Sequence, residues 1–155
     1  MTDNQAKNLY PFTTFNFSVE ISVEGIAPLV CNAAFSECDG LEMTMDVKSI
    51  REGGNNGRQF RLTGPMSFGT LTLKRGMSSS FDLWDWFIEM RTNPGLRADA
   101  EVVVHSADGK TVQVRYLLER CVPVKLKAPA LNAKDGLVAI EEMQLAYETL
   151  KIKKS

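Results

Sequence analysis

The stretch that decides the fold runs from Phe35 to Trp86. It opens with Phe35-Ser36-Glu37-Cys38-Asp39-Gly40-Leu41-Glu42, passes Arg51-Glu52-Gly53-Gly54-Asn55-Asn56 and Leu71-Thr72-Leu73-Lys74-Arg75-Gly76, and closes on Leu83-Trp84-Asp85-Trp86. Residues 41–47 alternate apolar and polar side chains, which predicts a half-buried β-strand, and residues 68–74 regain strand character. Between them, residues 48–64 are rich in glycine and charge. They are predicted to form a long exposed loop or a hairpin tip.

Strand patterns continue on both sides of this stretch. Phe17, Val19, Ile21 and Val23 alternate with polar residues, and a second apolar run follows at residues 29–35. Residues 101–118 predict a hairpin around Asp108-Gly109. A three-residue loop with Gly109 in the left-handed conformation is favoured over a two-residue loop. It would set Val102 and Val104 opposite Val114 and Val112 and unite the apolar face.

The last part of the chain is less clear from its pattern. Residues 122–136 contain two prolines and predict an extended connection. Residues 137–152 fit two structures. Met143, Leu145 and Tyr147 suit a strand, whereas Ile140, Met143, Tyr147 and Leu150 suit a helix, and periodicity leaves both open.

One helix is predicted from about Ser80 to Arg91. Ser79 is placed to cap it, with Asp82 three residues on, and Asn93-Pro94-Gly95 ends it. Its polar stripe is so narrow that we expect burial on more than one side. Trp84 and Trp86 point roughly 200° apart around the axis, so they cannot both face one sheet. We expect Trp84 in the core and Trp86 in contact with another subunit.

Composition bounds the class of protein. The 155 residues suit one domain, 1–155, with a flexible polar N-terminal segment at residues 1–11. The net charge of -1 predicts no general attraction to nucleic acid or membrane. The polar N-terminal residues lack the apolar core of a signal peptide, so synthesis in the cytoplasm is expected. Cys31, Cys38 and Cys121 are odd in number and lack a Cys-x-x-Cys spacing, so three reduced structural thiols are expected.

The candidate chemical motifs are weak. Residues 53–58 lack the Gly-Lys-Ser/Thr ending of a phosphate loop. Asp82 and Asp85 fall on the wet side of the helix, and His105 is the only histidine. We therefore expect no enzyme activity, no metal and no cofactor. The whole pattern predicts a mainly β fold of the α+β kind: an antiparallel barrel or sandwich of about seven strands with one flanking helix.

The four blocks between Phe35 and Trp86, in this order and spacing, resemble the tube proteins of contractile phage tails and of related extracellular injection systems. The alternating strand at 15–23 and the segment Leu145-Ala146-Tyr147-Glu148 also fit. The resemblance implies a barrel-like fold of two packed sheets, and it favours a strand over a helix near the C-terminus. It also implies hexameric rings that stack into a hollow tube for DNA or protein cargo.

The resemblance further implies which partners and residues matter. The partners would be other copies of the chain, sheath subunits, and baseplate and terminator proteins, with no membrane contact by the subunit. The loop 48–64 would reach the next ring. The predicted contact residues are Arg51, Glu52, Gly53, Gly54, Asn55, Asn56, Gly57, Arg58 and Trp86. Two alternatives remain: a ring-forming secreted carrier of the same fold, and a monomeric barrel that binds a small molecule.

Overall fold

The computed structural model describes residues 16–23, 26–33, 35–51, 54, 59–77 and 79–154, without the side chains of 26–33, 51 and 59. These residues form ten strands and one helix. The strands are β1 (Phe17–Val23), β2 (Ile26–Ala33), β3 (Glu37–Asp39), β4 (Met43–Arg51), β5 (Gln59–Phe68), β6 (Thr70–Gly76), β7 (Ala98–His105), β8 (Val112–Lys127), β9 (Ile140–Ala146) and β10 (Thr149–Lys154). The helix is α2 (Asp82–Thr92).

Eight of the strands join in one antiparallel sheet. Its order is β2-β1-β7-β8-β9-β6-β3, and β10 also pairs with β8. Within the described chain the path is open at β2 and β3, so the sheet is not closed into a barrel. The predicted antiparallel β fold with a flanking helix is confirmed, and the closed-barrel form of that prediction is corrected.

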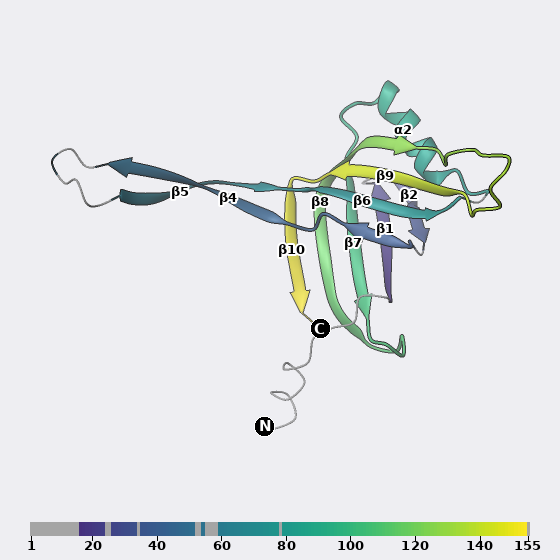
Figure 1. The fold of residues 1–155 in the computed structure, drawn as a ribbon, viewed down its shortest axis with the longest axis horizontal. Helices are drawn as coiled ribbons and strands as arrows, with labels where there is room; N and C mark the ends of the chain where they lie inside the picture. The colour runs from purple at the N-terminus through teal and green to yellow at the C-terminus, as the bar shows by residue number, and fades with distance from the viewer. Residues whose placement is uncertain are drawn as a thin grey trace.

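The long strand β8 lets the sheet fold over itself. Its first half pairs with β7 and β10, and its second half pairs with β9. At the change of partner, Arg120 has φ 54, a conformation that few non-glycine residues adopt. Two contacts support it: its N–H donates to Asp99 Oδ1 at 3.3 Å, and its Nε donates to Glu148 Oε2 at 2.9 Å. Strands β6 and β9 consequently run across β1, β7 and β10 (Figure 1).

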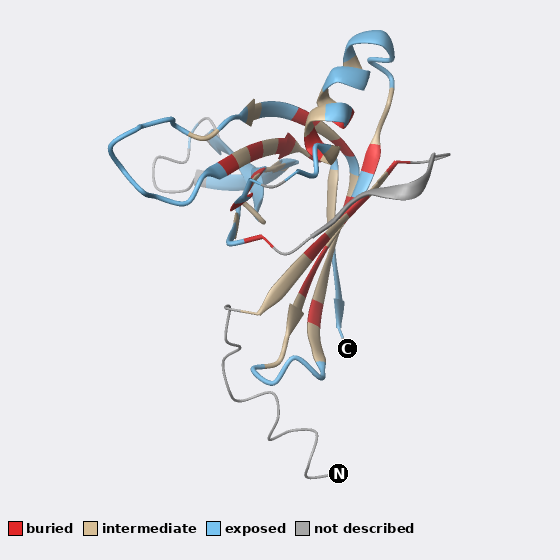
Figure 2. Ribbon diagram, turned by 90° about the vertical axis from the view of Figure 1, so that its right-hand side faces the viewer, coloured by how far each residue is buried: buried red, intermediate tan, exposed pale blue. Residues whose placement is uncertain are grey.

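The core fills the space between these crossed halves. Val19, Ile21 and Val23 of β1 point into it, as the alternating pattern predicted. They meet apolar side chains from the other half, chiefly Leu71, Leu73, Met143 and Leu145. Figure 2 shows this buried band along the middle of the strands. Because side chains alternate along each strand, each of the two crossed halves of the sheet has one apolar face, and these faces pack together as the core.

The helix differs from its prediction at its start and on its faces. It begins after Phe81, which makes no side-chain cap, so the cap expected from Ser79 is corrected; instead, Asp82 Oδ1 accepts from the N–H of Leu83 at 2.8 Å. Asn93 ends the helix as predicted. Leu83 and Trp86 are its buried residues, while Ile88 is exposed. Within the subunit the helix is therefore buried on one side, and the predicted burial of a second side, against a neighbouring subunit, stays a prediction.

Several strand predictions also change. Residues 122–127 belong to β8 rather than to a connection, with Pro123 beside a register shift. The C-terminal segment is strand, as the family resemblance favoured, and it forms β9 and β10. In the β7–β8 hairpin Gly109 is left-handed as predicted, with φ 74. The register is two residues away from the predicted one, because Val104 pairs with Val114 and Val102 with Tyr116.

Strands β4 and β5 form a separate two-stranded hairpin, which we call the arm. They pair from Met43↔Phe68 out to Arg51↔Gln59, with one irregularity between Met45 and Val47. The arm projects far from the rest of the molecule (Figure 1). The long loop predicted for residues 48–64 is therefore corrected, and its alternative, a hairpin, is confirmed with longer strands than a tip implies. Residues 48–51 and 59–64 are strand, paired by a ladder of backbone hydrogen bonds.

Candidate assembly surfaces

The arm is fixed to the subunit at its root. The Tyr147 hydroxyl accepts a hydrogen bond from the N–H of Glu42 at 3.1 Å and donates to the carbonyl oxygen of Gly40 at 2.7 Å. The Tyr147 ring also packs against Phe68, with ring centroids 5.8 Å apart. Tyr147 itself is buried. Both strands of the arm are thus held where they leave the core, which sets the direction in which the arm points.

Near its root the arm carries an exposed apolar patch on one face. Met43 pairs with Phe68, and Met45 pairs with Met66. Because cross-strand partners share a face, these side chains lie on the same side of the ribbon as Val47. Met43, Met45, Val47 and Met66 are all exposed. The alternating sequence had predicted a half-buried strand here, and that burial is absent from the subunit. Such a methionine-rich surface adapts easily to a partner.

Further out, the apolar side chains lie on the opposite face. Lys48 pairs with Leu62, and Ile50 with Phe60, so these four residues share one side of the ribbon. We call them the distal face. Ile50, Phe60 and Leu62 are exposed. An isolated two-stranded hairpin is marginal in water, so apolar patches on both of its faces indicate contact with other molecules.

Of the residues predicted from sequence as contacts, the structure describes only Arg51, Gly54 and Trp86. Arg51 lies in β4, but its side chain is not described. Gly54 is in a turn with φ 100, a conformation that favours glycine. Glu52, Gly53, Asn55, Asn56, Gly57 and Arg58 lie outside the described residues. The structure adds the exposed apolar residues of both faces, for which the only signal in the sequence was their alternation.

The predicted contact role of Trp86 is corrected. Its side chain is 3% exposed and lies in the core, so it has no surface to offer a second subunit. Trp84, predicted as the core residue, is half-buried, and its indole N–H donates to Glu141 Oε2 at 3.2 Å. The helix presents Leu83 and Trp86 to the sheet because these two positions share one side.

A buried ionic cluster ties α2 to the sheet. Glu141 of β9 is 1% exposed, and its Oε1 accepts from Arg75 Nε at 2.5 Å. The Nη2 of the same guanidinium lies 2.5 Å from Asp82 Oδ1 of α2, and the guanidinium carbon lies 5.6 Å from the centroid of the Phe35 ring. This pairing offsets the cost of burying the charges. It fixes where α2 lies on the sheet.

The side of α2 that faces away from the sheet carries both apolar and acidic side chains. Phe81, just before the helix, is 53% exposed and Ile88 is 55% exposed. Asp85 and Glu89 are exposed on the same side. We call these four residues the outer face of α2. Exposed residues of the helix are pale blue in Figure 2.

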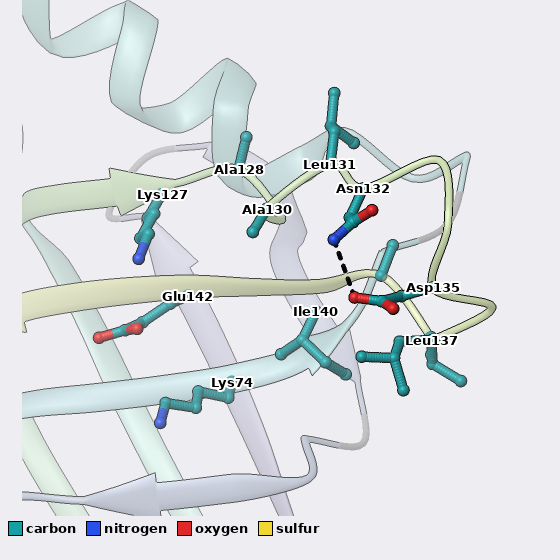
Figure 3. Close-up of a pocket in the computed structure, with 12 residues that line it drawn as sticks. Lys74, Lys127, Ala128, Ala130, Leu131, Asn132, Asp135, Leu137, Ile140 and Glu142 are labelled. Carbon is teal, nitrogen blue, oxygen red and sulfur yellow. Dashed lines mark hydrogen bonds between the residues drawn. The ribbon is translucent and has the colours of Figure 1, made fainter.

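At the end of the molecule opposite the arm, the connection 128–139 borders an open hollow of about 530 Å³. Figure 3 shows Leu131, Leu137 and Ile140 around it, with Lys74, Lys127 and Glu142 along one side. Asn132 donates to Asp135 at 2.9 Å across its rim. The hollow thus combines exposed apolar side chains with charges of both signs.

The thiols and His105 take ordinary positions. Cys38 and Cys121 are free, as predicted, and burial raises the pKa of each thiol to about 12. The side chain of Cys31 is outside the described residues. His105 Nε2 lies 3.3 Å from Ser18 Oγ. In the residues with a described position, no group of three His, Cys, Asp or Glu could hold a metal ion, and no helix is long and apolar enough to cross a membrane.

Comparison with solved structures identifies the fold. The chain is similar to a subunit of the anti-feeding prophage baseplate, with a TM-score of 0.83 and 23% identity over 94% of this chain and 97% of that one. It is also similar to a subunit of the PVC sheath–tube complex of an extracellular contractile injection system in the extended state. The TM-score is 0.82 and the identity 20%, over 100% of this chain and 99% of that one. Hcp1 from Flavobacterium johnsoniae is less similar, with a TM-score of 0.51 and 15% identity over 89% of this chain and 96% of that one.

Comparison of sequences identifies the family. No curated protein matches the chain. A family model does match, and it covers residues 13–151, which include the arm, the helix and both crossed halves of the sheet. The family is described as the T4-like virus tail tube protein gp19. The chain therefore belongs to the tail tube protein family and is a structural tail tube subunit.

Proposed function

We propose that six copies of this chain form a ring, and that the rings stack into a hollow tube that carries DNA or protein cargo. Membership of the tail tube family supports the tube. The observation that carries the proposal is the arm, which exposes large apolar side chains on both faces and points away from its own subunit. A surface of that kind is stable once it is covered by other molecules. Contacts that join unlike surfaces of identical subunits generate rings or filaments.

The solved structures to which this chain is similar support the same environment. One relative comes from a sheath–tube complex, and others come from a baseplate and from a tube-terminating cap. We extend this environment to the present chain, with sheath, baseplate and terminator proteins as its partners. The proposed role is structural, without turnover, metal or cofactor. The expectation of synthesis in the cytoplasm belongs to the same proposal.

The two alternative functions receive less support. The fold is closer to the injection-system subunits, with TM-scores of 0.78 to 0.83, than to the Hcp proteins, with TM-scores of 0.51 to 0.53. A barrel that binds a small molecule needs a closed sheet around its ligand. The described sheet is open.

Electron microscopy of the purified protein tests the proposal. We expect hollow tubes in side view and sixfold symmetry in end view. Sedimentation that shows only monomer at high protein concentration, with no rings in assembled particles, would overturn it.

The tip of the arm is tested separately. Arg58→Glu and deletion of residues 53–57 should leave the far-UV circular dichroism unchanged and shorten the tubes, and added salt should act in the same direction because it screens exposed charges. Tubes of normal length in both variants would remove the tip from the stacking contact.

A further inference from the structure

Two exposed surfaces of this chain complement each other in both polarity and charge. The outer face of α2 combines the apolar side chains of Phe81 and Ile88 with the carboxylates of Asp85 and Glu89. The distal face of the arm combines three exposed apolar side chains with Lys48. The two surfaces therefore share exposed apolar side chains and carry opposite charges.

The charge around the distal face extends beyond Lys48. Residues 48–61 hold four basic side chains, Lys48, Arg51, Arg58 and Arg61, and one acidic side chain, Glu52, so their net charge is 4 − 1 = +3. The whole chain has a net charge of -1. This end of the arm is therefore a basic segment on a slightly acidic molecule, and it favours an acidic partner surface.

The two surfaces cannot meet within one subunit. The arm projects from one end of the molecule, whereas α2 lies toward the other end (Figure 1). The root contacts of Tyr147 hold the arm in that direction. A contact between the distal face and α2 must therefore join two copies of the chain.

We propose that the outer face of α2 in one copy receives the distal face of the arm from another copy. Apolar side chains meet in the middle of this contact: Ile50, Phe60 and Leu62 lie against Phe81 and Ile88. Lys48 lies beside Asp85 and Glu89. The inference rests on the proposed self-assembly, and it names the surface that the arm contacts.

Two other surfaces fit the arm less well. The hollow beside residues 128–139 is apolar, but its charged residues are of both signs: Lys74 and Lys127 against Asp135 and Glu142. It therefore offers no net attraction for a basic segment. Contact between the distal faces of two arms would bring like charges together, which is unfavourable. Charge thus favours α2 over these two surfaces.

Charge reversal on each side tests the proposal. Lys48→Glu on the arm and Glu89→Lys on α2 should each abolish tubes at the protein concentration at which the unaltered chain assembles. Glu89 is in the last turn of the helix, where a cation suits the helix dipole, so this change leaves the helix intact. A chain with both changes restores an attractive pair and should regain tubes. Lys110→Glu, on the exposed β7–β8 turn, is the matched control and should assemble normally.

A cross-linking experiment gives a second measurement. One copy carries Leu62→Cys and the other carries Ile88→Cys, and the two are mixed, assembled and treated with a short bis-maleimide. A covalent dimer should form in the mixture and not when either variant is paired with the unaltered chain. Cys121 is buried and Cys38 is half-buried, and the two pairings with the unaltered chain control for reaction at the native cysteines.

The outcomes separate the two proposals. If the unaltered chain forms no rings or tubes, the proposed function fails. If it forms tubes but Glu89→Lys has no effect, or the combined variant fails to recover, or no cross-link appears in tubes, then α2 is not the receiving surface. In each of these three cases the proposed function stands.

Discussion

The hydroxyl oxygen of Tyr147 lies 2.7 Å from the carbonyl oxygen of Gly40, although 107 residues separate the two in the sequence. The same hydroxyl accepts from the N–H of Glu42. Glu42 immediately precedes β4, so this one side chain joins the end of β9 to the root of the arm. The direction of the proposed assembly element therefore depends on a buried hydrogen-bonding group in the core of the subunit.

Tyr147→Phe should lower the free energy of unfolding by about 1–3 kcal/mol, because it removes two part-buried hydrogen bonds, one to the carbonyl oxygen of Gly40 and one from the N–H of Glu42. Urea melts of the free subunit measure this loss. Tyr116→Phe is the control, since its hydroxyl makes no hydrogen bond within the described chain, and it should change stability by less than about 0.5 kcal/mol. Equal effects from both substitutions would contradict a special role for Tyr147.

Gly40→Ala should be destabilising for a reason that does not involve the hydroxyl. Gly40 has φ +103, and a Cβ atom there would lie 2.0 Å from the carbonyl oxygen of Thr70. The strained backbone alone costs about 1–3 kcal/mol, and the collision adds to it. Gly136→Ala meets no atom within 4 Å and should be neutral or stabilising by up to about 1 kcal/mol. Thermal melts of the two variants should therefore shift in different directions or by clearly different amounts.

Trp86→Ala should cost about 3–5 kcal/mol, because it removes a large side chain from the core and leaves a cavity. Trp84→Ala should cost less, since Trp84 is only half-buried and loses one hydrogen bond with Glu141. This order reverses the assignment made from the sequence. Denaturant melts that show the larger loss for Trp84 would mean that the helix is rotated relative to the structure described here.

Arg75→Met should cost about 3–5 kcal/mol, because Glu141 would keep a buried charge without its main partner. Changing both residues to methionine removes the charge as well, so the double variant should lose less than the sum of the single variants. Lys151→Met is the control: it breaks an exposed pair with Glu119 and should cost at most about 1 kcal/mol. Strictly additive losses in a double-mutant cycle would show that Arg75 and Glu141 are not coupled.

The buried thiols predict a loss of stability at alkaline pH. Burial raises the pKa of Cys38 and Cys121 to about 12 in the folded chain, from an ordinary value of 9.0. Their contribution is therefore complete below pH 9 and is lost between pH 9 and 12, where the unfolded chain ionises first. Urea melts at pH 8 and pH 10 should show a steeper decline for the unaltered chain than for a Cys38→Ala, Cys121→Ala variant. Parallel declines would assign the alkaline loss to other groups.

The sequence by itself determined the local structure. Alternating apolar residues predicted β1 and β6, the Leu83–Trp86 segment predicted a helix, and Asp108-Gly109 predicted a turn with Gly109 left-handed. These features depend on side-chain periodicity and backbone freedom, which neighbouring residues decide together. The order of four short blocks also indicated the family, because their spacing reflects one fixed succession of strands, arm and helix.

Which face of each strand or helix is buried and which is exposed depends on the tertiary structure. Alternation at Met43, Met45 and Val47 looks the same whether the apolar face meets a core or projects into solvent, so the arm was not separable from a half-buried strand. Trp84 and Trp86 are equally apolar, and the sequence does not show which of them faces the sheet; in the structure Trp86 is buried and Trp84 is hydrogen-bonded to Glu141. Contacts between residues distant in sequence made both choices, and a local pattern carries no information about such contacts.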